Sequence, residues 1–148
     1  MGIVTGRNSE RVIMSTNYYN TFIEVADDCP VSTAAIPQPR GEIKTVAFLQ
    51  YEMIADRPYG FTQDDILFAV FAERQRIPTT DRPGEREKFL AKDQPCLRSS
   101  SLGKRYGWGV HNDGHGRVAL FAVESRAYRD LVDDDSLKHL KAMRSRRA

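Results

Sequence analysis

The spacing of hydrophobic residues changes once along this chain of 148 residues, and that change limits the fold more than any other feature. Before about residue 92, apolar side chains recur every three or four positions, as in helices with one buried face. After that point, short apolar runs separated by glycine-rich turns indicate strands. Helices and strands kept in separate parts of a chain indicate an α+β domain. We therefore expect a single domain with a small antiparallel sheet and a C-terminal hairpin packed against several helices.

Three helices are expected before residue 92. The first covers residues 45–56 and ends before Pro58, which restricts its continuation. The second covers residues 62–76, where Thr62 can cap the first turn. A short third helix is expected in GEREKFLAK. A short strand in NTFIEVA precedes them, followed by a long proline-rich loop.

The last third of the chain predicts a hairpin and two more helices. CLRSSSLGKRYGWGVH and GRVALFAVES are expected as strands, with Asp113 and Gly114 supplying the positive backbone angles of the turn. Ser125 can cap the helix that follows. A terminal helix is expected to begin at Asp135 or Ser136 and to bury leucines and Met143.

The expected strand around the only tryptophan has one nearly bare face. Tyr106, Trp108 and Val110 alternate with Gly107, Gly109 and His111, and alternate residues of a strand face opposite sides. Glycines inside a strand mark a bulge, a close approach of another segment, or room for a ligand. Two interpretations follow: a helix packs against the glycines, or a ligand groove lies there.

The segment before this strand carries hydroxyl and cationic side chains suited to an anion. Such groups donate hydrogen bonds to a phosphate or carboxylate, although a solvated basic loop has the same composition. Together with the glycine face, they predict one concave site for a small anionic ligand or an acidic partner side chain. Its expected residues are Arg98, Ser99, Ser100, Ser101, Lys104, Arg105, Gly107, Trp108, Gly109 and His111.

Two enzyme hypotheses compete with this ligand- or partner-binding module. His111 and His115, with Asp113 between them, could hold a metal, but turn-tip side chains usually face solvent and no third ligand is evident. Cys96 could act as a nucleophile with His111 as its base, or could be a small buried residue. We expect no metal and no cofactor.

The basic tail LKHLKAMRSRRA is the one argument for nucleic acid. Acids precede it, so the charges also match the dipole of a terminal helix. If the tail binds nucleic acid, its basic side chains would contact the phosphates. These side chains are Lys138, Lys141, Arg144, Arg146 and Arg147.

Composition excludes some classes of protein. The formal charge of +2 is too small to indicate a nucleic-acid partner for the whole chain. The expected protein is cytoplasmic, with no membrane partner and both Cys29 and Cys96 reduced. Residues 1–16 show neither helical nor strand periodicity, and we expect them to form a disordered leader. We expect residues 17–148 to form the domain.

Several segments together resemble a family of small bacterial proteins classed as a domain of unknown function. They are NYYNTFIEVADDCPV, KTVAFLQYEMI with PYGFTQDDILFAVFAERQ, QPCLRSS, KRYGWGVHNDGHGRVALFAVES and LKAMRSRR. The likeness covers about residues 17–148. It implies a bacterial, single-domain protein beginning near Met14, and it brings no activity or catalytic residue.

Overall fold

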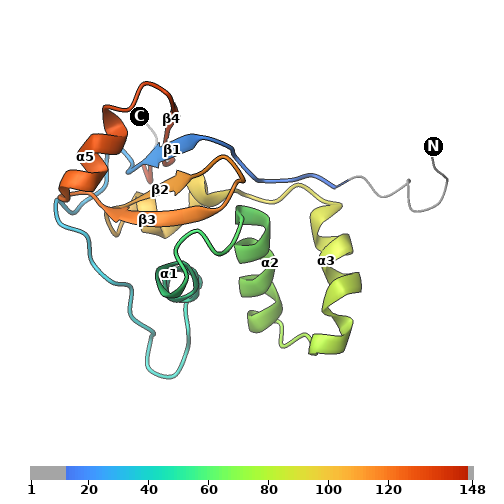
Figure 1. Ribbon diagram of the computed structural model, residues 1–148. Coiled ribbons are helices and arrows are strands. Elements are labelled where there is room, and N and C mark those ends of the chain that lie inside the picture. The colour runs from blue at the N-terminus through green and yellow to red at the C-terminus, as the bar shows by residue number, and fades with distance from the viewer. Residues whose placement is uncertain (1–12, 147–148) are drawn as a thin grey trace, which may run out of the picture.

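A four-stranded mixed sheet in the order β3-β2-β1-β4 forms one layer of the molecule (Figure 1). The computed structural model describes residues 13–146. Its strands are β1 (Thr21–Glu24), β2 (Trp108–Asn112), β3 (Val118–Ala122) and β4 (Lys138–Lys141). β2 runs antiparallel to β1 and β3, whereas β4 runs parallel to β1. The α+β single domain and its hairpin are confirmed, but the purely antiparallel sheet is wrong.

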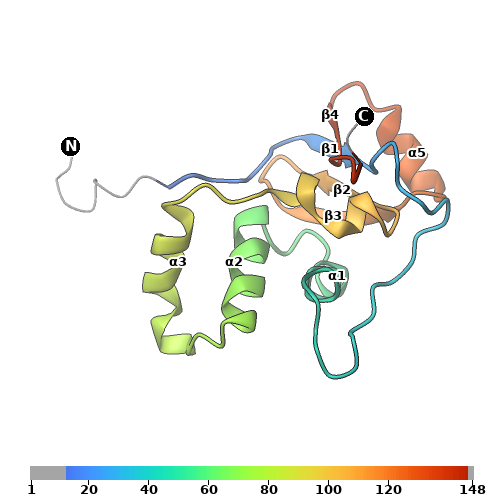
Figure 2. The same ribbon diagram turned by 180° about the vertical axis from the view of Figure 1, so that it is seen from behind.

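Helices cover both faces of the sheet. They are α1 (Val46–Asp56), α2 (Gln63–Arg74), α3 (Arg82–Leu90), α4 (Ser101–Lys104) and α5 (Arg126–Val132), with 3-10 turns η2 (Thr79–Asp81) and η3 (Leu97–Ser99). Figures 1 and 2 show α5 beyond the sheet on one side, α1 on the other, and α3 outside α2. The predicted helices at residues 45–56, at 62–76, in GEREKFLAK and after Ser125 are confirmed.

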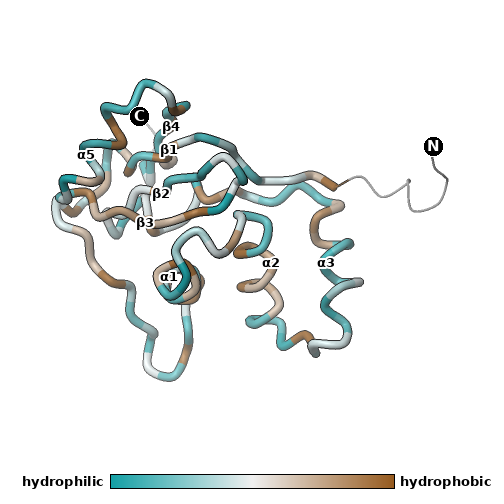
Figure 3. The backbone as a smooth tube through the Cα atoms, viewed as in Figure 1, coloured by the Kyte–Doolittle hydropathy of each residue, from teal (hydrophilic) through white to brown (hydrophobic). Residues whose placement is uncertain are grey.

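The main core lies between the sheet and the α1, α2 and α4 layer. Ile23, Val110 and Val118 project from the sheet and pack in one cluster with Ile54 of α1 and Ile66 of α2. Figure 3 shows the matching hydropathy: β3 is brown along much of its length, whereas α3, outside this layer, is largely teal. Both faces of the hairpin are therefore covered, as its double apolar pattern predicts.

The chain before β1 is bonded to α2 and α3. The Met14 N–H donates to Leu90 O at 2.7 Å, and the Ser15 and Thr16 hydroxyls donate to the buried carboxylate of Asp64. Of the leader expected at residues 1–16, residues 1–12 lie outside the described residues. Residues 14–16 thus contact the first turn of α2 and the last turn of α3.

A buried amide pair joins α2 to the sheet. Gln63 Nε2 donates to Asn112 Oδ1 at 2.8 Å, and both residues are fully buried. The other ends of these amides are also bonded, because Gln63 Oε1 accepts from Leu97 N and Asn112 Nδ2 donates to Thr21 O. One buried hydrogen-bond network therefore joins α2, β1, β2 and the segment at Leu97.

The terminal helix predicted from Asp135 or Ser136 is wrong, because residues 138–141 form β4. Asp134 accepts bonds from the Ser136 backbone and hydroxyl, which makes a local turn instead of a helix cap. Pairing with β1 then supplies backbone partners, since Ala142 N donates to Glu24 O. Leu140 and Ala142 pack on the core two positions apart, and the helical interpretation of the leucines missed this strand spacing.

The long strand predicted over residues 96–111 is also shorter than expected. Residues 97–104 form η3 and α4, because the Ser100 hydroxyl accepts from Leu102 N as a helix cap. The turn of the hairpin differs as well: its positive φ lies at Gly116, at 78°, and not at Asp113 or Gly114. Serines that suit an exposed loop also suit a cap, so composition alone does not separate the two.

Replacing Gln63 with leucine should destabilise the protein by about 2–4 kcal/mol, because Asn112 Oδ1 and Leu97 N would lose their buried partner. Urea unfolding of Gln63→Leu measures this. Gln75→Leu, at the exposed end of the same helix, should change the free energy of unfolding by under about 0.5 kcal/mol. Equal effects of the two substitutions would contradict the role of the amide pair.

Candidate functional site

A hollow of about 350 Å³ lies where α1, α2 and α3 meet the chain leading into α4, and we call it the serine groove. Its apolar wall comes from the three helices, through Val46, Ala47, Leu67, Val70, Phe71 and Phe89. Its polar wall comes from Gln50, Gln75, Gln94, Cys96 and the serines at 99–101. The groove therefore offers one apolar and one hydrogen-bonding side.

Gln50 is a buried polar residue that lines this groove. The residue is only 4% exposed, and its Oε1 accepts from the Ser100 hydroxyl at 2.6 Å. Ser100 Oγ in turn accepts from Leu102 N, and its own proton is donated to Gln50 Oε1. Among the described residues, Gln50 Nε2 has no hydrogen-bond partner. A buried NH₂ group without a partner is costly unless something in the groove accepts from it.

Arg74 supplies the charge of the serine groove. It stands in the last turn of α2, and it is the one charged side chain among those that line the groove. No acid of the described chain forms an ion pair with it. The groove thus combines an unpaired cation, an open amide donor and an apolar wall.

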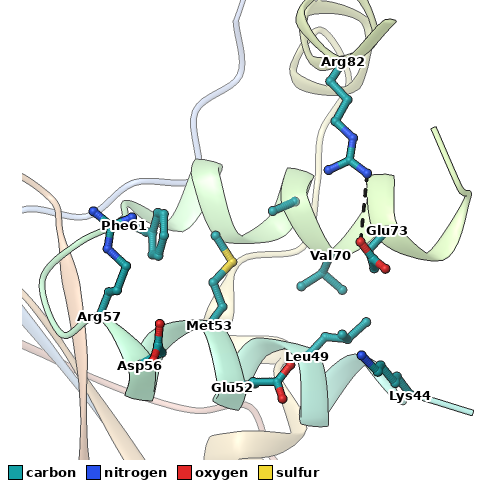
Figure 4. A pocket seen from close by; sticks show the side chains of 11 residues that line it. Lys44, Leu49, Glu52, Met53, Asp56, Arg57, Phe61, Val70, Glu73 and Arg82 are labelled. Carbon is teal, nitrogen blue, oxygen red and sulfur yellow. Dashed lines mark ion pairs between the residues drawn. The ribbon is translucent and has the colours of Figure 1, made fainter. Parts of the chain in front are cut away.

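A second hollow, of about 600 Å³, lies on the other side of the α1–α2 contact (Figure 4). Figure 4 shows Met53 reaching into it, with the Arg82–Glu73 ion pair at its rim. Val70 lines both hollows and so separates them. Glu52 and Asp56, two acids that line this second hollow, are exposed. It therefore lacks the buried open donor of the serine groove.

The structure separates the residues predicted to form one anion site. Ser99, Ser100 and Ser101 line the serine groove. Arg98 Nε instead donates to Lys141 O at 2.8 Å, toward β4. Lys104 and Arg105 stand at the end of α4, and Arg105 lines a different hollow with Asp28, Pro30, Ser145 and Arg146. Only the serines of the expected set reach the groove.

The glycine face of β2 is filled by protein. A Cβ built on Gly109 would lie 2.6 Å from Tyr128 Cε2 and 2.7 Å from Phe22 Cζ, so α5 packs directly over this glycine. Gly107 precedes the strand with φ 82°, against the loop that follows β1. Trp108 faces α1 and donates from Nε1 to Ala35 O at 2.8 Å. Of the two interpretations, the packed helix is the one observed at Gly109, and the expected groove there is absent.

The histidines do not complete either enzyme hypothesis. His111 Nδ1 is hydrogen-bonded to the Tyr59 hydroxyl at 2.7 Å, and His115 is exposed at the turn. The described residues contain no group of three or more His, Cys, Asp or Glu that could hold a metal. Cys96 contacts the Tyr18 hydroxyl at 3.5 Å, and in the described chain it has no hydrogen bond to an imidazole.

The basic tail is partly neutralised by the loop after β1. Lys141 pairs with Asp27 at 2.8 Å, and the backbone N–H groups of Ser145 and Arg146 donate to Asp28. These bonds lower the pKa of Asp28 and keep it charged. Arg147 lies outside the described residues. Residues 138–141 form β4, so the predicted basic helix is wrong, whereas the nucleic-acid contact of the tail stays a prediction.

Sequence reasoning missed Gln50 and Arg74. Gln50 falls among apolar residues on the buried stripe of α1, and that position was the available signal, because a polar residue on a buried stripe needs a partner. Arg74 gives no such signal, since a basic residue at the end of a helix is explained by the helix dipole alone.

Comparison with known proteins gives a family and no activity. A family model described as a family of unknown function (DUF6157) matches residues 13–148. No curated protein and no solved structure matches the chain. In the part of the chain that the structure describes, none of the helices has the length and apolar character to cross a membrane.

Gly109→Val should cost about 1–3 kcal/mol of stability, because the new side chain would overlap Tyr128 and Phe22. Gly114→Ala is the matched control, since a Cβ there meets nothing closer than 3.4 Å. Thermal or urea unfolding of both variants compares their stabilities and so separates a packed helix from an open groove beside Gly109. A Gly109→Val protein as stable as the Gly114→Ala protein would show that the space beside β2 is open.

Acid should destabilise the fold partly through His111. Burial lowers the pKa of His111, and the carboxylates of Asp113 and Asp134 oppose this only in part. The unfolded chain, with a histidine pKa of about 6.5, then takes up the proton more readily. The stability contributed by neutral His111 is therefore present above that pH and is lost as the pH falls from about 7 to 5.

Urea unfolding at both ends of this pH range tests the effect. His111→Gln should lose less free energy of unfolding on acidification than the wild-type protein does. His115→Gln, changed at the exposed turn, should keep the wild-type dependence. If His111→Gln also keeps it, the histidine does not contribute to acid sensitivity.

Proposed function

The chain belongs to the DUF6157 family, whose function is unknown, and we propose that it is a small-molecule-binding module whose ligand occupies the serine groove. The observation that carries this is Gln50, a buried residue that lines the groove and whose Nε2 group has no hydrogen-bond partner in the described part of the chain. A carbonyl, carboxylate or phosphate oxygen of a ligand would accept from it. A binding protein keeps such a donor open because the ligand completes it.

The ligand carries an anionic group on an apolar body. Arg74 is the charged residue of the groove, and guanidinium groups bind carboxylates and phosphates through paired hydrogen bonds. The Ser101 hydroxyl, half-buried in the same wall, supplies a neutral donor. Phe71 and Phe89 form the apolar side with ring centroids 4.8 Å apart. A groove of about 350 Å³ fits a small aromatic or aliphatic acid or phosphate ester.

This proposal keeps the predicted anionic ligand and moves it from the glycine strand to the α1–α2 side of the serine segment. A bacterial origin and a cytoplasmic location remain predictions from the sequence. A protein partner also remains a prediction. The surface we propose for its contact is the exposed, charged hollow of Figure 4.

Arg74→Gln should weaken binding of phenyl phosphate about tenfold, because one charge-assisted contact is worth roughly 1.4 kcal/mol or more. Phenyl phosphate and benzoate should shift the backbone amide NMR signals of residues 97–101 in wild-type protein, whereas benzylamine should not. Gln50→Met should also weaken binding, with the free energy of unfolding measured alongside, since Ser100 loses its acceptor.

The control is Arg126→Gln, which removes one equal charge from α5, across the sheet from the groove. It should leave the affinity for phenyl phosphate unchanged. Absence of any shift at residues 97–101 with either anionic probe would refute the proposed site. Equal binding of benzylamine would refute the anionic class.

A further inference from the structure

Cys96 stands between two hollows at the entrance to η3. On one side it lines the serine groove. On the other it lines a smaller hollow of about 250 Å³, formed by residues 14–18 with Asp93 and Gln94. The side chain is half-buried, so the thiol is sheltered but within reach of a small reagent.

A phenol hydroxyl lies beside the thiol of Cys96. The Tyr18 hydroxyl lies 3.5 Å from Cys96 Sγ. Burial, followed by the bond to Cys96, raises the pKa of Tyr18, and nearby Arg98 only partly opposes this. The protonated phenol can donate a hydrogen bond to the Cys96 sulfur. A thiolate, and not a thiol, attacks disulfides.

The charges on the two sides of Cys96 differ in sign. The serine groove carries Arg74, whereas the smaller hollow carries Asp93. An anionic reagent is attracted on the groove side and repelled on the other. Gln50, whose Nε2 has no partner among the described residues, lines the same groove, where it could donate a hydrogen bond to such a reagent.

The chain does not supply a second thiol at this place. Cys29, the only other cysteine, lies in the loop after β1, and both cysteines are free. Cys29 lines neither of the hollows that Cys96 lines. A disulfide at Cys96 therefore takes its second sulfur from another molecule.

We infer that Cys96 is a modification site that forms a mixed disulfide with a small anionic thiol through the serine groove, and that this disulfide regulates ligand binding. The Cys96 thiolate attacks one sulfur of a small disulfide, the old S–S bond breaks, and the other half leaves as a thiolate that takes a proton from water. The small disulfide is reduced as Cys96 is oxidised. The attached group then fills the groove. This inference rests on the proposed function, because its regulatory effect is exclusion of the ligand.

Oxidised glutathione, which is anionic, and cystamine, which is cationic, are the two probes. In Cys29→Ser protein, the rate of adduct formation at Cys96 is followed by intact-mass measurement and located by peptide mapping. Adding Arg74→Gln should slow the reaction with oxidised glutathione about three- to tenfold and leave cystamine unslowed. Adding Arg126→Gln, the equal charge change on α5, should slow neither. Unfolding midpoints of the variants confirm that each is folded.

Modification with oxidised glutathione should abolish the NMR shifts that phenyl phosphate causes, and a reducing agent should restore them. Reduced Cys29→Ser protein, whose substitution lies outside the serine groove, should bind phenyl phosphate before modification. If reduced Cys29→Ser protein binds phenyl phosphate but Arg74→Gln does not slow oxidised glutathione, the inference fails and the proposed function stands. If phenyl phosphate fails to bind reduced Cys29→Ser protein, the proposed function fails, and the regulatory claim with it.

Discussion

The hydrogen bond between Gln63 and Asn112 fixes the position of the helical layer on the sheet. Apolar contacts alone would let α2 slide along β2, because dispersion and burial are not directional. Two fully buried amides allow one arrangement, since any slip leaves polar atoms without partners. The same network holds Leu97 N, the start of the segment that carries the serines. The wall of the serine groove is thus set by a bond outside the groove.

The sequence predicted the elements whose signals are local. Helices α1, α2, α3 and α5 follow from apolar spacing and from caps such as Thr62 and Ser125, which the structure confirms. β4 could not be found in this way. Its four residues gain their backbone hydrogen bonds from β1, more than a hundred positions earlier, and nothing in KHLK itself reports that pairing.

The candidate site was predicted only in part, for the same reason. Hydroxyls at 99–101 were identified as donors from their composition, and they do line the groove. The glycines at 107 and 109 are close to these serines in sequence, but the loop after β1 lies against Gly107, and Tyr128 of α5 and Phe22 fill the space beside Gly109. Gln50 joins the serines from a distant helix, which only the packing of α1 against α4 reveals.

The parallel pairing of β1 with β4 has a consequence for the order of folding. β1 is a central strand, yet both of its neighbours come from the last third of the chain. During synthesis its backbone N–H and C=O groups must wait until the ribosome has released residues 108–112 and then 138–141. Contacts of such long sequence separation close slowly. The nascent chain therefore holds a strand with two unpaired edges until its C-terminal segment arrives, and such edges favour pairing with other chains.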